Sequence, residues 1–115
     1  MNTPYTFFQD LAREAAPPAD GILSRTLYQD DWIKAVIFGF GPGQELPEHT
    51  ASMPALLQIV SGEATLVLGG ESHEAQAGTW VHRPANLNHS IRTKTPVVML
   101  LLLLKPPAAP GISAE

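Results

Sequence analysis

Short apolar segments separated by turn residues run through most of this sequence, and they limit the folds that it can adopt. The segments lie at residues 22–28, 32–40, 56–60, 64–68, 79–83 and 90–93, and a polar one lies at residues 71–75. Turn signals such as Ser61-Gly62 and Gly69-Gly70 recur roughly every eight to ten residues, which is typical of an all-β sandwich or barrel. The pattern therefore predicts an all-β fold in which residues 71–75 form an edge strand.

The longest apolar run covers residues 97–104 and does not alternate. A helix is the competing interpretation, but the length of the run and the flanking Pro96 and Pro106 favour a strand. A strand that is apolar on both faces must be covered on both. We expect one face to fill a barrel and the other to meet the N-terminal helix, a second sheet or another subunit.

The two ends of the chain differ from the barrel segments. Thr3-Pro4 is typical of a helix start, because a hydroxyl caps the first turn and proline fits the first helical position. Apolar residues then recur at helical spacing, at Phe8, Leu11, Ala12 and Ala15. We predict a short helix and a linker in residues 1–20, the barrel in residues 21–105 and a flexible tail in residues 106–115.

Composition excludes several classes of function. Lys and Arg number 7 against 11 Asp and Glu, and they are scattered, so the chain lacks the cationic surface that binds nucleic acid. The absence of cysteine excludes disulfides, thiolate zinc sites and a cysteine nucleophile. The longest apolar run falls short of the roughly 20 residues of a membrane span, and the N-terminus has no secretory signal pattern. A cytoplasmic protein with no nucleic-acid or membrane partner is expected.

Two histidines stand at fixed distances from glycine and proline. His49 closes a segment that begins at Gly43, and His89 closes one that begins at Gly78. Two predicted strands joined by a turn lie between these segments. In a sheet that rolls into a barrel, the two segments can then meet inside it. We predict that His49 and His89 face each other inside the barrel and mark a pocket, close enough to share one ion or one water.

These residues resemble the two sequence motifs of the cupin superfamily, and the resemblance extends over residues 22–104. The matching positions are Gly43, His49 and Gly62 in the first motif and Gly78, Pro84 and His89 in the second. Asn86 stands where the second motif has a glycine, and asparagine tolerates the left-handed backbone that glycine supplies. The resemblance implies a double-stranded β-helix, or jelly-roll, barrel.

The metal-binding residues of that superfamily are only partly present. The resemblance implies a divalent ion held by two histidines and a glutamate of the first motif and by the histidine of the second. Here Ala51 and Ala55 replace one histidine and the glutamate, so His49 and His89 remain as candidate metal ligands; Thr93 replaces a closing asparagine. With two ligands, we expect zinc, nickel, manganese or iron to bind weakly or not at all.

Several neighbours are candidates for the pocket. His82 is a candidate third ligand or base if its strand turns the face shared with Trp80 inward, and a half-exposed outward position is the alternative. His73 is expected to be exposed. The candidate pocket wall consists of Ala51, Met53, Ala55, Leu57 and Trp80.

The leading functional interpretation is a cupin that binds a small molecule, with or without a weak metal ion. The alternatives are a metal-dependent dioxygenase, isomerase or lyase acting on a small organic acid, and a non-catalytic sensor or interaction domain. No nucleophile pattern is present, so catalytic residues stay unassigned. A homodimer is expected, because the two-sided strand and the apolar helix face exceed what one small barrel covers.

Overall fold

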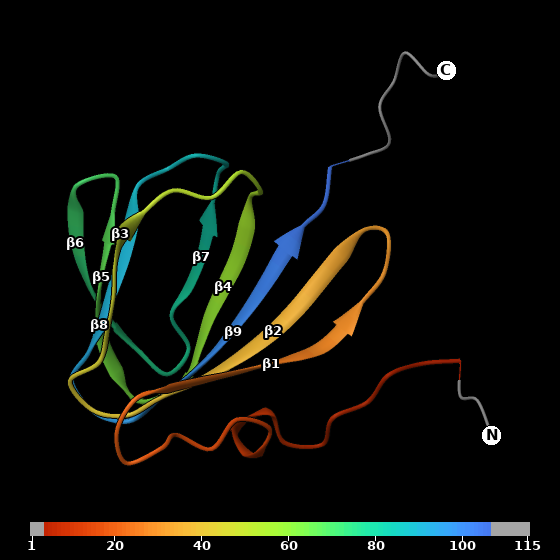
Figure 1. The fold of residues 1–115 in the computed structure, drawn as a ribbon, viewed down its shortest axis with the longest axis horizontal. Helices are drawn as coiled ribbons and strands as arrows, with labels where there is room; N and C mark the ends of the chain where they lie inside the picture. The colour runs from red at the N-terminus through yellow and green to blue at the C-terminus, as the bar shows by residue number, and fades with distance from the viewer. Residues whose placement is uncertain (1–3, 107–115) are drawn as a thin grey trace.

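The computed structural model describes residues 4–106, so Thr3 and nearly all of the predicted tail lie outside it (Figure 1). The described chain is almost entirely β-structure, and the predicted all-β jelly roll is confirmed. The strands are β1 (Ile22–Gln29), β2 (Ile33–Phe40), β3 (Glu45–His49), β4 (Ala55–Ser61), β5 (Glu63–Leu68), β6 (Glu71–Gln76), β7 (Trp80–Arg83), β8 (His89–Thr93) and β9 (Val97–Leu104).

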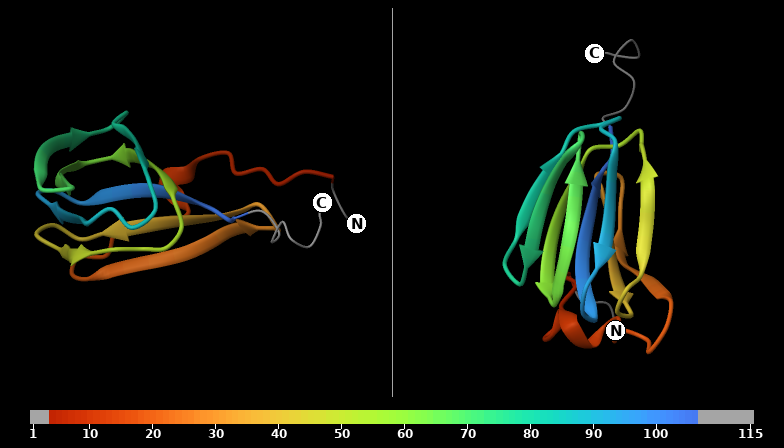
Figure 2. Two further views of the ribbon diagram at one scale, coloured as in Figure 1. Left: turned by 90° about the horizontal axis from the view of Figure 1, so that it is seen from above. Right: turned by 90° about the vertical axis from the view of Figure 1, so that its left-hand side faces the viewer.

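The strands form two antiparallel sheets that pack face to face. The five-stranded sheet has the order β1-β2-β9-β4-β7, and the four-stranded sheet has the order β3-β8-β5-β6. Figure 2 shows the two layers from above and from one side. The polar segment predicted as an edge strand is β6, which lies at the edge of the four-stranded sheet.

Strand β9 supplies side chains to both faces of the larger sheet. Val97 and Met99 belong to the core between the sheets, together with Phe40, Ile59 and Leu66. Val98, by contrast, belongs to a second apolar cluster on the outer face. The run of apolar residues is thus a strand covered on both faces, and each fully buried side chain of this size contributes about 1.5–3 kcal/mol.

The N-terminal segment covers part of the outer face of the larger sheet. Its helical part is a single 3-10 turn, Leu11–Arg13, capped by the Asp10 carboxylate, which accepts a hydrogen bond from Ala12 N. Ala15 packs on Ile37 and Val98 behind this turn. The contact is close, because a Cβ added to Gly39 would lie 2.2 Å from the Ala15 carbonyl oxygen.

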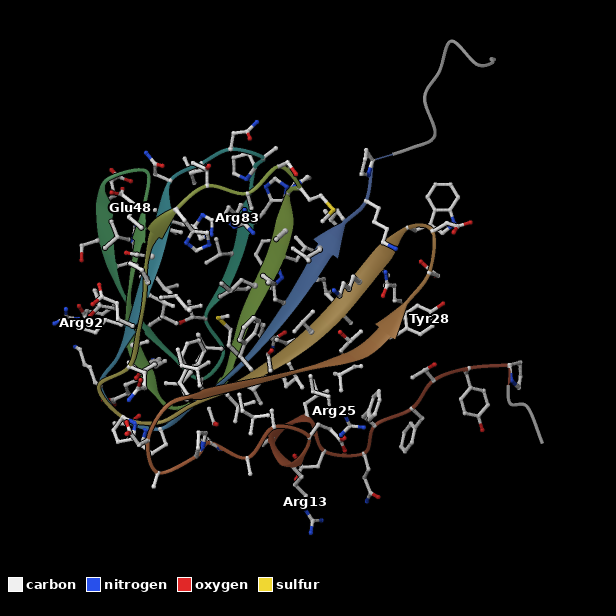
Figure 3. The ribbon with its side chains drawn as sticks, viewed as in Figure 1. Arg13, Arg25, Tyr28, Glu48, Arg83 and Arg92 are labelled. Carbon is white, nitrogen blue, oxygen red and sulfur yellow. The ribbon has the colours of Figure 1, made fainter. Side chains whose placement is uncertain are left out.

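The short helix therefore exists, but it starts after Asp10 and not at Pro4. Isolated helices of fewer than about 12 residues are marginal in water, so contact with the sheet decides the conformation of this segment. Arg25 of β1, labelled in Figure 3, also holds the segment on the sheet through an ion pair with Glu14. Within residues 4–106, no helix has the length and apolar character that crossing a membrane requires.

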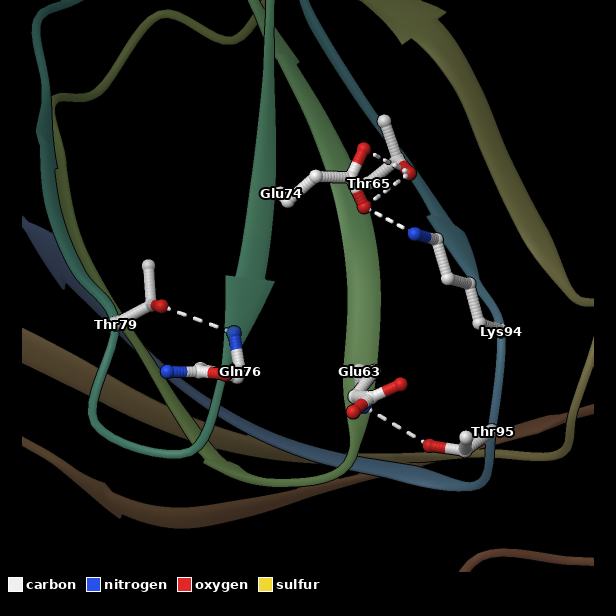
Figure 4. Close-up of polar contacts among 7 residues, drawn as sticks. All are labelled: Glu63, Thr65, Glu74, Gln76, Thr79, Lys94 and Thr95. Atoms are coloured by element: carbon white, nitrogen blue, oxygen red, sulfur yellow. Dashed lines mark hydrogen bonds and ion pairs between the residues drawn. The ribbon is translucent and has the colours of Figure 1, made fainter.

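The outer face of the smaller sheet is polar. Lys94 forms an ion pair with Glu74, and the Thr65 hydroxyl donates to the same carboxylate at 3.1 Å (Figure 4). Thr95 Oγ1 accepts a hydrogen bond from the backbone N–H of Glu63 at the end of this sheet. These side chains satisfy one another in solvent, so this face presents an ordinary hydrated surface.

Candidate functional site

His49 and His89 meet at one end of the barrel. His49 is the last residue of β3 and His89 the first of β8, and the two are cross-strand partners. Their ring centroids lie 4.1 Å apart with the planes at 56°. The structure thus brings together the two histidines that the sequence motifs single out.

A break in strand pairing turns His49 toward the interior. Leu46 pairs with Ile91 of β8, and the register shifts before His49 pairs with His89. Pro47 lies in this irregular stretch, where it has no register partner on β8, a position that a residue without an N–H tolerates. Such bulges re-aim side chains. Without the extra residue, strict alternation would place His49 on the opposite face from Leu46.

Each histidine is oriented by a backbone carbonyl. His49 Nδ1 lies 2.8 Å from the Pro47 oxygen, and His89 Nδ1 lies 2.8 Å from the Leu87 oxygen. A carbonyl only accepts hydrogen bonds, so each Nδ1 carries the proton and each Nε2 keeps its lone pair when the ring is neutral. Both Nε2 atoms are therefore available to a ligand, a metal ion or a water.

A cavity of about 160 Å³ lies between the two sheets beside this pair. Its polar wall residues are His49, Arg83, His89 and Ser90, and the rest of the wall is apolar. The complete wall is formed by Phe38, Leu46, His49, Ala51, Leu57, Leu66, Leu68, Val81, Arg83, His89, Ser90, Ile91, Met99, Leu101 and Leu103. A cavity of about 150 Å³ holds one benzene molecule, so this one suits a small organic compound.

Arg83 is the most unusual residue of the cavity. It ends β7, points between the two sheets, and is only 3% exposed (Figure 3). Among the described residues it forms no ion pair, and its single hydrogen bond runs from Nη1 to the Met53 carbonyl at 3.4 Å. An isolated buried charge costs about several kcal/mol, and one long hydrogen bond offsets little of that.

Electrostatics in the cavity disfavour additional positive charge. Burial lowers the pKa of Arg83, although a guanidinium stays protonated in proteins. Burial is also the largest effect on His89 and lowers the pKa of its ring. The hydrogen bond to the Leu87 carbonyl raises this pKa, and the charges of Arg83 and His49 lower it. His89 is therefore neutral at pH 7, and the cavity holds one permanent cation.

Four of the five predicted pocket residues lie at the cavity or beside it. Ala51 and Leu57 line the cavity. Ala55 is fully buried next to Arg83 but does not reach the cavity wall, and Met53 contributes its carbonyl oxygen to Arg83 and no side chain to the wall.

The expectation that Trp80 lines the pocket is wrong, and of the two positions considered for His82 the structure shows the outward one. Trp80 is 60% exposed, and His82 is exposed as well. On β7 the inward side chains are Val81 and Arg83, and alternation sends Trp80 and His82 to the outer face. A third metal ligand therefore does not come from β7.

The donor set does not fit a tightly held divalent ion. Within residues 4–106, no group of three or more metal-ligating side chains converges. The two Nε2 atoms lack a carboxylate partner, and the nearby Arg83 guanidinium repels a dication. The one feature that this pair shares with metal-binding histidines is the backbone carbonyl that orients each ring.

Arg83 is the functional candidate that the sequence analysis missed. In the segment 80–83, an apolar residue and a polar one occupy each face, so hydrophobicity alone favours an inward Trp80 and an outward Arg83. The pairing of Arg83 with the buried Ala55 of β4 gives the opposite register. The four residues of this strand carry no signal of their own that sets this register.

Loop hydrogen bonds connect the strands at both ends of β8. Asn86 adopts the expected left-handed backbone with φ of 67°, and its N–H donates to the Ala51 carbonyl at 2.8 Å.

At the other end of β8, the buried Thr93 hydroxyl donates to the Gly41 carbonyl at 2.8 Å and accepts from Gln44 N. Thr93 thus has a structural role that ties the loop before β3 to β8.

Comparison with known proteins identifies relatives of the whole chain. The family model of the cupin domain matches residues 36–103. A conserved protein of unknown function from Streptococcus pyogenes is 30% identical, with a TM-score of 0.81 over 94% of this chain and 95% of that one. A cupin superfamily protein from Desulfitobacterium hafniense is 24% identical, with a TM-score of 0.80 over 92% of this chain and 97% of that one.

The Desulfitobacterium hafniense structure and more distant ones show a shared fold alone. A putative mannose-6-phosphate isomerase from Ralstonia eutropha is 20% identical, with a TM-score of 0.76 over 87% of this chain and 99% of that one. No functionally curated protein matches this sequence.

Proposed function

Because this chain belongs to the cupin family, we propose that it binds a small organic molecule in the cavity between its two sheets. The observation that carries the proposal is the cavity of about 160 Å³, apolar over most of its wall and polar where His49, His89 and Arg83 lie. Binding sites for small molecules combine an apolar wall with a few polar groups that fix orientation.

Binding is tested with a neutral probe of matching size. Benzamide is titrated into labelled protein, and the backbone amide signals of cavity residues are followed by NMR. We expect shifts centred on residues such as Leu57, Val81 and Ile91, which line the cavity from three strands. Shifts spread over the outer faces, or none at all, would count against the proposal.

A cavity-filling variant supplies the control. Ala51→Phe places a ring at the cavity wall and should abolish the shifts, while the matched Ala77→Phe change lies on an exposed turn and should leave them unchanged. Equal binding by both variants would mean that the probe binds elsewhere.

A weakly held divalent ion is the second candidate, favoured by the free Nε2 atoms of His49 and His89. Structural zinc sites with four ligands bind with about 10–16 kcal/mol, so two ligands should give a Kd on the order of micromolar at best. Calorimetric titration with zinc or nickel tests this, and the signal should vanish in His89→Ala and persist in His82→Ala.

A further inference from the structure

Most of the hydrogen-bond donors of Arg83 have no partner among the described residues. A guanidinium has five N–H donors, and only Nη1 has a bond, to the Met53 oxygen. No fully buried side-chain nitrogen of the described residues lacks a partner, so the unpaired Nε and Nη2 atoms of Arg83 keep some accessible surface, and Arg83 lines the cavity.

We infer that Arg83 makes this cavity a site for a small organic monocarboxylate, whose carboxylate pairs with the guanidinium and whose apolar part fills the rest of the space. The inference rests on the proposed function and specifies its ligand class.

A carboxylate fits because of charge and shape. The guanidinium fork matches the two oxygens of a planar carboxylate, and such bidentate pairs are among the strongest hydrogen bonds in proteins. The cavity holds one permanent cation with no acidic side chain on its wall, so a single negative charge balances it. The apolar wall, which includes Leu57, Leu66 and Met99, lowers the polarity around the guanidinium, and an ion pair is stronger in such surroundings.

The positions of the histidines are consistent with a ligand whose carboxylate lies at Arg83 and whose other end points toward the surface. Arg83 is buried, His89 is half-buried and His49 is exposed, so the polar groups run from the interior to the surface. A ligand anchored at Arg83 would therefore present any hydroxyl or amide N–H near the Nε2 lone pairs of His89 and His49.

The wild-type protein is tested with benzoate and benzamide at pH 7.5. The two have the same ring and similar size, but only benzoate carries a charge. We expect benzoate to bind at least tenfold more tightly, since a hydrogen bond to a charged group is typically worth a tenfold factor or more. In NMR spectra of the wild type, benzoate should also shift the Arg83 Nε–Hε signal.

Variants test the contribution of the guanidinium to binding separately from any effect on folding. Arg83→Gln should lower benzoate affinity at least tenfold and leave benzamide affinity within about threefold. Arg92→Gln is the matched control, because Arg92 points away from the barrel and pairs with Glu45 on the surface (Figure 3). If Arg83→Gln does not fold, the wild-type comparison and the Nε–Hε signal decide the question.

The outcomes distinguish the two proposals. Benzoate and benzamide binding in the cavity with equal affinity, or benzoate binding without a shift of the Arg83 signal, overturns the carboxylate inference and leaves the proposed function standing. Failure of both probes to bind in the cavity overturns both.

Discussion

Ala55 and Arg83 face each other directly across the β4–β7 pair. Position 55 is where the cupin resemblance implies a metal-binding glutamate, and here a methyl group lies beside a buried cation. The local charge is therefore the opposite of what a divalent ion requires. This relationship disfavours tight binding of a divalent ion by the two histidines.

Restoring the metal ligands requires removing this cation. The change Ala51→His with Ala55→Glu should supply the missing donors, but the introduced glutamate would also pair with Arg83. We expect the triple change with Arg83→Met to raise zinc or nickel affinity at least about a hundredfold over wild type, and the double change to raise it less. Calorimetry measures both.

Thermal shifts provide the check on folding. A carboxylate among buried groups lowers stability, and bound metal should restore it through linkage. Equal, small shifts with metal in the wild type and the triple variant would show that Ala51 and Ala55 do not border the histidine pair.

The stability of the protein should fall as pH decreases through the range in which His89 titrates. Burial lowers the pKa of His89 below the value of about 6.5 that the unfolded chain has. Below pH 6.5 the unfolded state therefore binds more protons, and the free energy of unfolding decreases with decreasing pH. The groups that face this ring are His49 and Arg83.

Urea denaturation at pH 7.5 and pH 5.5 measures the effect. His89→Gln should reduce the loss of stability between these two values, and His73→Gln, a change at an exposed position, should not. A loss of stability that is the same in all three proteins would rule out His89 as its source.

Thr93 should contribute to stability through its hydroxyl. Thr93 is 2% exposed, and Thr93→Val keeps its shape but leaves the Gly41 carbonyl and the Gln44 N–H without this partner. We expect the free energy of unfolding to fall by about 1–3 kcal/mol. The surface change Thr65→Val should cost less than about 0.5 kcal/mol, and an equal effect of both would contradict the assigned role.

A homodimer remains a prediction. Apolar side chains that the N-terminal segment leaves uncovered on the outer face of the larger sheet indicate the surface through which it would form. The N-terminal segment covers Val98, while Leu56 and Leu102 stay half-buried on the outer face near the exposed Trp80. We expect dimers at tens of micromolar in sedimentation experiments and monomers for Trp80→Glu. The control Trp32→Glu changes an exposed tryptophan at the β1–β2 turn and should stay dimeric. A monomeric wild type would refute the prediction.

The sequence predicted the strands because turn residues and alternation mark each of them locally. It predicted the histidine pair because the spacings of His49 and His89 from Gly43 and Gly78 resemble those of the cupin motifs. The left-handed Asn86 was predicted because its conformation depends on its own side chain.

Arg83 was missed because its position depends on strand pairing. A four-residue strand contains too few residues to show which face is buried, and a one-residue change of register exchanges the faces. The Ala55–Arg83 pair fixes that register through contacts distant in sequence. The N-terminal helix was overestimated for a related reason, because packing on the sheet and not local propensity determines that segment.

A crystal structure of the wild-type protein with benzoate tests the central claim most directly. The account predicts one benzoate in the cavity between the sheets, with both carboxylate oxygens within hydrogen-bond distance of the Arg83 guanidinium and the ring against Leu57 and Met99. A water-filled cavity at saturating benzoate, or a benzoate whose carboxylate points away from Arg83, would contradict it.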